Sequence, residues 1–537
     1  MHKFQVLCIV LSKYYSEDFF MSVFENEKKE NEAAAGASFI ERESRISGIR
    51  CECSQDYVLP DYMGDVKRLL RYTASAVPCN KYVSGGEVSF LCTVNFRVMY
   101  LDSDNILTEA SFSTDFEHSE KVSDTVTDAT VTSDVHNVTV RLGGPRKISA
   151  KASLVTDISL SEECPRDEGD FSDAICMRKT VKVHSADYGK SAEREYAEEL
   201  ERFEDLLADE VDVVKYDAEA YIDGAHPTDN GVNLSGFINA YCILRVGDDL
   251  VRIEKCIPVE ENIEFEDVCR DSCYIGSCYV TGVNLNVNNT PEDKDGNTYL
   301  SVVMNMTLEC EAEHHRNREY ELVADAFREG EENTSVFGAF DYNELIGAVS
   351  ERKKISLVQD RDEENLHDII EKCASVKNLK YEVGASEITV TCDLFLTFVC
   401  RGADTGECFS VKMEDAVCEK IKMPGATDAC KIRISAVPCE VSPAFDSEKI
   451  YAETTLIITA LAEDGKREPI LTLLNSEKKC ASGARRITVY YPEQKDTLWS
   501  VSKKYGISPE RIAQYNMLSR DSNGECTLEG KRKIIIC

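Results

Sequence analysis

Three segments of the chain repeat one pattern of apolar, charged and small residues. They read VKRLLRYTASAVP, VDVVKYDAEAYI and LHDIIEKCASVK, and without gaps they align three apolar pairs: Leu69–Leu70, Val213–Val214 and Ile369–Ile370. Three alanines then also share one position: Ala74, Ala218 and Ala374. Such self-similarity indicates one supersecondary unit used in several copies. Because a chain of 537 residues is too long for one ordinary core, we expect each copy to be a domain.

Each copy continues into a run in which apolar residues alternate with smaller or polar ones. The runs read EVSFLCTVNFRVMY, GVNLSGFINAYCIL and EITVTCDLFLTFVC, and they align Glu87 with Glu387 and Cys92 with Cys392. In the first run, one side carries apolar residues at every second position: Val88, Phe90, Cys92, Val94, Phe96 and Val98. A period of two predicts strands with one buried face, as in antiparallel sheets that pack face to face.

A second segment also recurs after these strands. KISAKASLVTDI from Lys147 resembles KIYAETTLIITA from Lys449, and YLSVVMNMTLEC is a weaker middle copy. The sequence therefore predicts a mainly β chain with three tandem antiparallel, sandwich-like domains.

We place these domains at residues 51–165, 178–328 and 353–480. Polar, charged linkers are expected at 25–44 and 161–173, and residues 1–50 are expected to be a disordered leader or to follow a misassigned start. The lead-in to each copy is expected to be helical or turn-like. A longer helix is expected before the second copy, where apolar residues recur with helical spacing and would pack within the chain: Tyr188, Ala192, Tyr196, Leu200, Phe203 and Leu207.

Composition narrows the possible partners. Acidic residues outnumber basic ones by 97 to 61, for a formal charge of −36. Such a surface repels phosphate backbones, so we expect no nucleic-acid partner. No stretch is apolar enough for the about 20 residues that a bilayer requires, so we expect no transmembrane segment.

The 23 cysteines are odd in number and scattered, and many lie in apolar runs. Buried, reduced thiols explain this distribution better than a disulfide framework. Neither the cysteines nor the eight histidines show the spacing of a zinc site. We therefore predict no metal and no cofactor.

Motifs that carry catalysis are missing from the sequence. Walker A spacing, HExxH and GxSxG do not occur, and no polar motif recurs at matching positions of the three copies. A triplicated β unit of this kind is more often a scaffold or a recognition surface. We expect a protein that is not an enzyme and has no catalytic residues.

The last 50 residues differ from the rest in the pattern of secondary structure that they predict. ITVYYP and KRKIIIC are typical of strands, and two short helices are predicted between them. Thr497 or Asp496 can cap the first helix and Gly506 can end it, whereas Ser508 and Pro509 can begin the second. This βααβ module, residues 486–537, is expected to draw its core partly from four residues of the helices: Trp499, Val501, Tyr505 and Ile512.

The stretch DTLWSVSKKYGISPERIAQYN closely resembles the LysM domain. LysM domains bind N-acetylglucosamine-containing glycans of peptidoglycan or chitin in a groove between the loop before the first helix and the loop after the second. The resemblance places the binding residues of this chain in two groups: Lys495, Asp496, Thr497 and Leu498, and Tyr515, Asn516, Met517 and Leu518. Lys495 stands where the family usually has glycine.

The upstream copies resemble the SPOCS repeat of Clostridia-type spore-forming bacteria, on the segments VLPDYMGDVKRLLRY, VMYLDSDN and GGPRKISAKASL. The combination of SPOCS repeats and a terminal LysM domain implies a morphogenetic scaffold of the spore coat. The resemblance further implies work in the mother-cell cytoplasm and at the forespore surface, with the LysM domain contacting the coat's basement ATPase or another coat protein.

Two alternatives are a cell-wall protein that binds peptidoglycan glycan and a wall hydrolase targeted by its LysM domain. The module carries nine basic and six acidic residues from Arg486 onward, on an otherwise acidic chain. A basic module can dock an acidic protein or an anionic wall polymer, or fold back on its own repeats.

Overall fold

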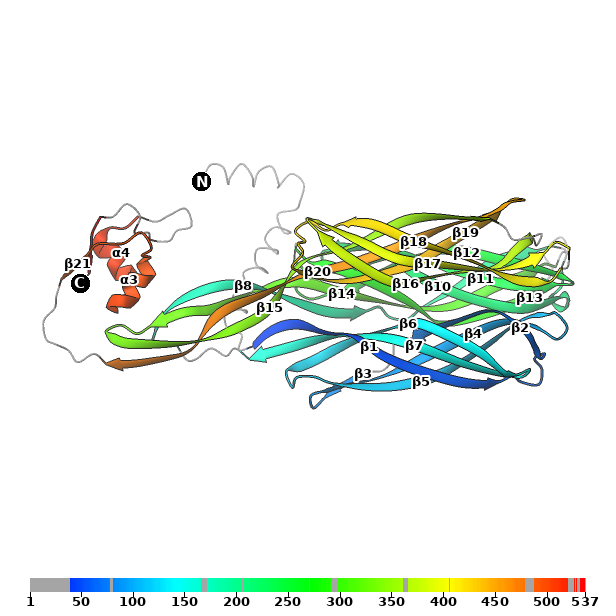
Figure 1. The fold of residues 1–537 in the computed structure, drawn as a ribbon, viewed down its shortest axis with the longest axis horizontal. Coiled ribbons are helices and arrows are strands. Elements are labelled where there is room, and N and C mark those ends of the chain that lie inside the picture. The colour runs from blue at the N-terminus through cyan, green and yellow to red at the C-terminus, as the bar shows by residue number, and fades with distance from the viewer. Residues whose placement is uncertain are drawn as a thin grey trace.

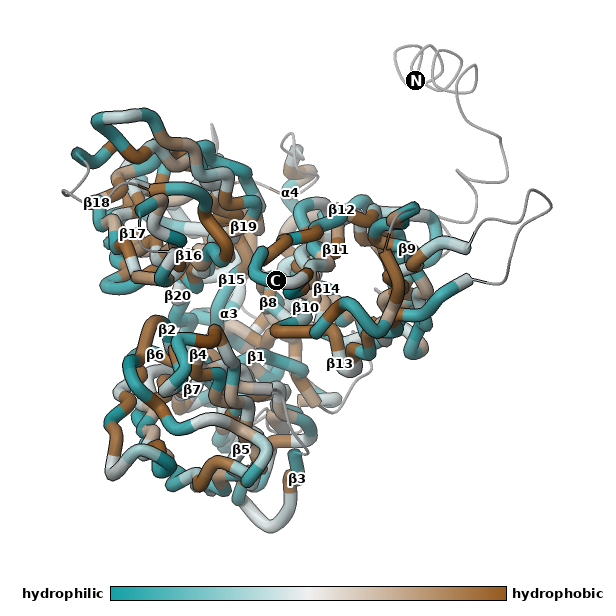
Figure 2. The backbone as a smooth tube through the Cα atoms, turned by 90° about the vertical axis from the view of Figure 1, so that its right-hand side faces the viewer, coloured by the Kyte–Doolittle hydropathy of each residue, from teal (hydrophilic) through white to brown (hydrophobic). Residues whose placement is uncertain are grey.

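Three elongated β lobes lie side by side around a common long axis in the computed structural model, and the C-terminal module lies at one end (Figure 1). Viewed along that axis, the lobes surround a shared centre (Figure 2). The structure describes residues 39–77, 81–165, 171–204, 206–269, 271–290, 298–360, 366–404, 406–478, 487–519, 526, 528 and 532–536. The expected mainly β class is confirmed.

The first lobe consists of two antiparallel sheets. One sheet has the order β1 (Phe39–Val58), β7 (Lys147–Pro165), β6 (Val126–Gly144). The other joins β2 (Val66–Val77), β4 (Glu87–Asp102), β3 (Lys81–Ser84) and β5 (Leu107–Lys121). The first and last strands of the lobe are thus hydrogen-bonded to each other, which closes the lobe as a unit.

The second lobe has the same order of strands. Its first sheet joins β8 (Ile175–Lys190), β14 (Leu300–Phe327) and β13 (Cys273–Asn289), with β9 (Arg194–Phe203) added beside β14. A 3₁₀ turn, η1 (Ala208–Glu210), leads to the second sheet, β10 (Val211–Thr228), β11 (Gly231–Val246) and β12 (Asp249–Glu264).

The third lobe repeats this arrangement again. One sheet has the order β15 (Glu331–Asp360), β20 (Lys449–Lys478), β19 (Cys430–Phe445), and the other has the order β16 (Leu366–Gly384), β17 (Glu387–Gly402), β18 (Cys408–Lys422). All pairings in the three lobes are antiparallel.

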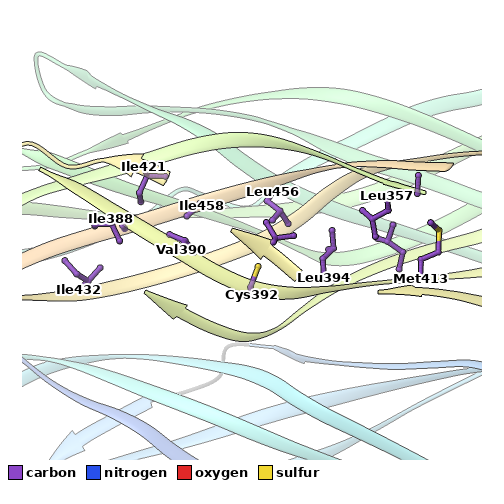
Figure 3. Close-up of a cluster of buried hydrophobic side chains, with 14 of the residues drawn as sticks. Leu357, Ile388, Val390, Cys392, Leu394, Met413, Ile421, Ile432, Leu456 and Ile458 are labelled. Carbon is purple, nitrogen blue, oxygen red and sulfur yellow. The ribbon is translucent and has the colours of Figure 1, made fainter. Parts of the chain in front are cut away.

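Each lobe buries its own apolar core between its two sheets. The alternation predicted for residues 88–98 is confirmed, because every second side chain from Val88 to Val98 is buried. Cys92 and Cys392 are buried free thiols at matching positions of β4 and β17. Figure 3 shows Cys392 and Leu394 of β17 inside the core of the third lobe, with Leu456 of β20.

Each copy has a β-bulge at the same position of the repeat, and the three copies contact one another there. Leu70, Val214 and Ile370 are each the extra residue that interrupts the register of β2, β10 and β16. A bulge redirects a side chain out of the regular alternation. These three residues belong to one apolar cluster shared by the lobes, together with Met99, Leu101, Leu107, Ile243, Leu250, Val399 and Cys408.

The residue after each bulge is charged, and the three meet in the interior. Glu371 accepts hydrogen bonds from Arg71, from Lys215 Nζ at 2.9 Å and from Arg252 Nη1 at 2.6 Å. Burial acts to raise the pKa of Glu371, but the positive charges of Lys215, Arg71 and Arg252 outweigh it and lower the pKa to about 2. Tyr241 also donates to this carboxylate, at 3.2 Å.

Several expectations about segments were wrong. The lead-ins of the copies are the strands β2, β10 and β16, and the helix expected at 188–207 is the end of β8 followed by β9. Residues 39–50, placed in a leader and a linker, form the first part of β1, and residues 331–352 form the first part of β15. Residues 1–38 and the linker residues 166–170 lie outside the described residues.

The helix prediction failed because strand pairing of β9 with β14 outweighed the local helix propensity of this segment. Nine residues of β9 pair with β14, and Leu200 is its one fully buried side chain among many charged ones. A charged edge strand of this kind protects the sheet from further pairing, and such tertiary context overrides helix propensity.

The C-terminal module has the predicted βααβ order. It consists of β21 (Thr488–Tyr490), α3 (Leu498–Tyr505), α4 (Pro509–Asn516) and β22 (Ile534–Ile536). The helices found in the described residues are too short to span a lipid bilayer.

Candidate binding surface of the C-terminal module

The two helices of the module are held by an apolar core and by local caps. Leu498, Val501 and Ile512 are buried against Ile534 and Ile536 of β22. The hydroxyl of Thr497 accepts from Ser500 N at 3.0 Å, and Gly506 ends α3 with a φ of 64°, as the sequence predicts. Ser508 caps α4, and Pro509 is its first residue.

The loop before α3 owes its shape to Asp496. Its Oδ2 accepts from Tyr490 Oη at 2.6 Å and from Glu493 N at 2.8 Å. The hydrogen bond from Tyr490 lowers the pKa of Asp496, and the same bond raises the pKa of Tyr490 to about 12. Asp496 therefore braces the loop, and the neighbouring Lys495 and Thr497 are exposed.

The loop after α4 is fixed by Asn516. Its amide nitrogen donates to Ile512 O at 2.9 Å and to Ile535 O at 2.7 Å, and its Oδ1 accepts from Ile535 N at 2.6 Å. Leu518 packs against the module core. Tyr515 and Met517, in contrast, are 58% and 87% exposed.

The eight residues predicted to bind thus divide into two groups. Asp496, Leu498, Asn516 and Leu518 support the loops, because their side chains bond or pack inside the module. The other four side chains are exposed, including Thr497, whose hydroxyl also caps α3. They form the surface that we call the open loops: Lys495, Thr497, Tyr515 and Met517.

Of the four predicted core residues, Val501, Tyr505 and Ile512 lie in or against the module core, but Trp499 does not. The indole ring packs edge-on against Phe327 of β14, with ring centroids 5.4 Å apart. Trp499 Nε1 donates to Asp325 Oδ2 at 2.9 Å, and Lys503 Nζ donates to Asp325 Oδ1 at 2.5 Å. The prediction that Trp499 belongs to the module core was therefore wrong.

A second group of contacts lies at the turn between the helices. Ser508 N donates to Glu329 Oε1 at 2.8 Å, and Gly330 N donates to Gly506 O at 3.1 Å. Arg511 lies 3.7 Å from Glu329. Together with the contacts of Trp499, these bonds dock the module on the end of β14 and on the turn that joins it to β15 (Figure 1).

Sequence reasoning did not identify Asp325, Glu329 and Phe327 as docking residues. The sequence indicated them only indirectly. A basic module on an acidic chain can fold back on its own repeats, but this does not say which acidic residues it contacts. Docking leaves the open loops uncovered, since their exposure holds in the complete chain.

Residues 493–522 match the family model of the LysM domain. The match includes α3, α4 and both loops described above. A LysM domain indicates binding of peptidoglycan or a related N-acetylglucosamine glycan. Comparison with curated proteins gives no match.

Proposed function

We propose that the chain is a non-enzymatic assembly scaffold of the spore coat whose LysM module binds a peptidoglycan-type glycan through the open loops. The observation that carries the proposal is the division of the module into two faces. One face, with Trp499 and Lys503, contacts the second lobe and the start of the third, and the other presents Tyr515 and Met517 to solvent.

The chemistry of the open loops suits a glycan. Exposed aromatic and thioether side chains pack on the apolar faces of sugar rings, whereas the Thr497 hydroxyl and the Lys495 ammonium offer polar contacts to hydroxyl groups. The bonds of Asp496 and Asn516 preorganise both loops, so little conformational entropy is lost when a ligand binds.

The three lobes support the scaffold part of the proposal. Buried charges pair between the lobes, since Glu371 of the third lobe contacts Arg71 of the first and Lys215 of the second. Such an arrangement favours a single fixed body over a set of independently moving domains. In this view the body sets where the glycan-bound module stands relative to the rest of the coat.

A protein ligand is the second candidate. It is favoured by Lys495, which stands in place of the usual glycine, and by the almost complete exposure of the apolar Met517. Exposed apolar side chains of this kind are typical of protein interfaces. The partner would be the coat's basement ATPase or another coat protein.

One experiment separates the two candidates. The full chain is incubated with insoluble peptidoglycan, with cellulose as the control polymer, and separately with the purified coat ATPase. We expect retention on peptidoglycan that Tyr515→Ala weakens about tenfold, or ~1.4 kcal/mol. Tyr491→Ala is the control, because Tyr491 is a 68% exposed tyrosine of the same module that is not one of the four residues of the open loops.

Binding to the ATPase alone, lost in Met517→Asp, would replace the glycan by the protein partner. Binding to neither ligand would refute the proposed role of the open loops.

A further inference from the structure

Two histidines and a glutamate from different lobes converge in the interior, far from the LysM module. Glu43 lies on β1 of the first lobe, and His184 and His315 lie on β8 and β14 of the second. His184 Nε2 is 3.0 Å from His315 Nδ1, and Glu43 Oε2 is 3.5 Å from the former nitrogen and 3.6 Å from the latter. All three side chains are buried, and their ligand atoms point toward one another.

The outer nitrogens of both histidines contact carboxylates. His184 Nδ1 bonds to Glu463 of the third lobe, and His315 Nε2 bonds to Glu313 at 2.8 Å. Carboxylates in these positions accept the outer N–H protons, which leaves the lone pairs of the inner nitrogens facing each other. Histidines that bind metals are oriented by outer carboxylates in this way.

Glu43 contributes an independent observation. Its Oε2 atom is buried and has no hydrogen-bond partner, while Tyr188 donates to the other oxygen at 3.4 Å. A buried carboxylate oxygen without a partner is costly, and a bound cation removes that cost. The unpaired oxygen is the one that faces the two inner nitrogens.

The spacing and the charge both fit a divalent ion. The point equidistant from the three ligand atoms lies about 2.0 Å from each, which is the length of a zinc–nitrogen or zinc–carboxylate bond. Around this point Glu43, Glu313 and Glu463 carry three negative charges, and Arg433, bonded to Glu313, carries one positive charge. One divalent ion balances this set.

We propose that Glu43, His184 and His315 bind one Zn²⁺ at the junction of the three lobes. A cavity of about 190 Å³ lined by Glu43, Arg433 and Glu463 adjoins the site and provides an entry path and space for water as a fourth ligand. Zn²⁺ joins the first and second lobes directly, and Glu463 ties the third to the same centre through His184.

The test uses the full chain, freed of metal with a chelator and kept under a thiol reductant. We expect one tightly bound Zn²⁺ per chain by elemental analysis after dialysis, and a thermal midpoint that rises with the Zn²⁺ concentration. His184→Gln should lower the affinity at least tenfold. His314→Gln is the matched control, because His314 is also buried but bonds to Ser272 at 2.7 Å and stacks on Tyr274.

The cysteines require a separate readout, since thiolates also bind zinc. Co²⁺ in place of Zn²⁺ should give visible d–d bands without the near-ultraviolet charge-transfer band of a cobalt–thiolate bond. This spectrum of the unmodified chain decides the proposal even where His184→Gln fails to fold. A thiolate band, the absence of stoichiometric metal, or equal binding by folded His184→Gln would each overturn it.

Discussion

Arg71 of the first lobe and Glu371 of the third form a buried ion pair, although 300 residues separate them in the sequence. They occupy the same position of the repeat, one residue after the bulge, and Lys215 is their counterpart in the second lobe. Identical residues at this position would bring three like charges together. The divergence of the copies therefore makes the lobes complementary and favours one arrangement of them.

Removal of the single acidic member should destabilise this junction strongly. Glu371→Gln removes the carboxylate that Arg71, Lys215 and Arg252 share. Among the described residues, only Glu109 beside Lys215 and Glu254 beside Arg252 then remain as contacting counter-charges, and we expect a loss of about 3–5 kcal/mol in the free energy of unfolding. Chemical denaturation measures this loss. Glu382→Gln, at an exposed position of the same strand, should stay within about 0.5 kcal/mol of the unmodified chain; equal effects of both variants would contradict the central role of Glu371.

The carboxylate of Glu371 should also make the free energy of unfolding depend on pH in the acidic range. Because the folded pKa of Glu371 is about 2, below its ordinary value of 4.5, its contribution is complete above pH 4.5 and is lost as the pH falls toward 2. The difference corresponds to roughly 3 kcal/mol. Denaturation midpoints between pH 7 and pH 3 should fall less steeply in Glu371→Gln, and parallel slopes would count against the assignment.

The bulge residues should carry more packing energy than their neighbours. Ile370→Ala removes a buried side chain from the shared cluster and should cost about 2–5 kcal/mol. Val213→Ala changes the residue just before a bulge, which is 43% exposed, and should cost about 0.5 kcal/mol or less. Thermal unfolding of both variants checks the difference, and a large effect of Val213→Ala would mean that the wrong member of the pair faces the axis.

These bulges also explain which part of the repeat the sequence could predict. Alternation in β4 and β17 identified the strands, since one face of each is buried. In the lead-ins, two adjacent apolar residues break the period of two and suggested helix or turn. The break is a bulge, and only the second member of each pair, such as Val214 after Val213, joins the shared cluster.

The contacts between lobes could not be predicted from sequence patterns. His184 and His315 are 131 residues apart, do not belong to a local motif, and meet only because β8 and β14 are neighbouring strands. Glu43 lies in a polar segment that was interpreted as a linker, yet it belongs to β1. Helix caps at Thr497 and Ser508, by contrast, depend on a few adjacent residues and were predicted correctly.

The cysteines should differ in reactivity according to their burial. Cys92 and Cys392 are buried, whereas Cys256 and Cys418 are exposed free thiols on β12 and β18. In the native protein an alkylating reagent should modify the exposed pair quickly and the buried pair only after unfolding. Mass spectrometry of the labelled peptides measures this order. Rapid labelling of Cys92 or Cys392 in folded protein would contradict their place in the cores.

Docking of the LysM module should be visible in the fluorescence of the only tryptophan in the chain. Trp499 packs on Phe327 and bonds to Asp325, so Asp325→Ala should release the module and shift the emission to the red as the indole becomes hydrated. The far-ultraviolet circular dichroism should not change, because the module core does not include Trp499. Glu332→Ala, at an exposed position near the docking site, is the control and should leave the emission unchanged. An unshifted emission in Asp325→Ala would show that Asp325 does not hold the module on the second lobe, and a loss of helical signal would show that docking is needed for the module to fold.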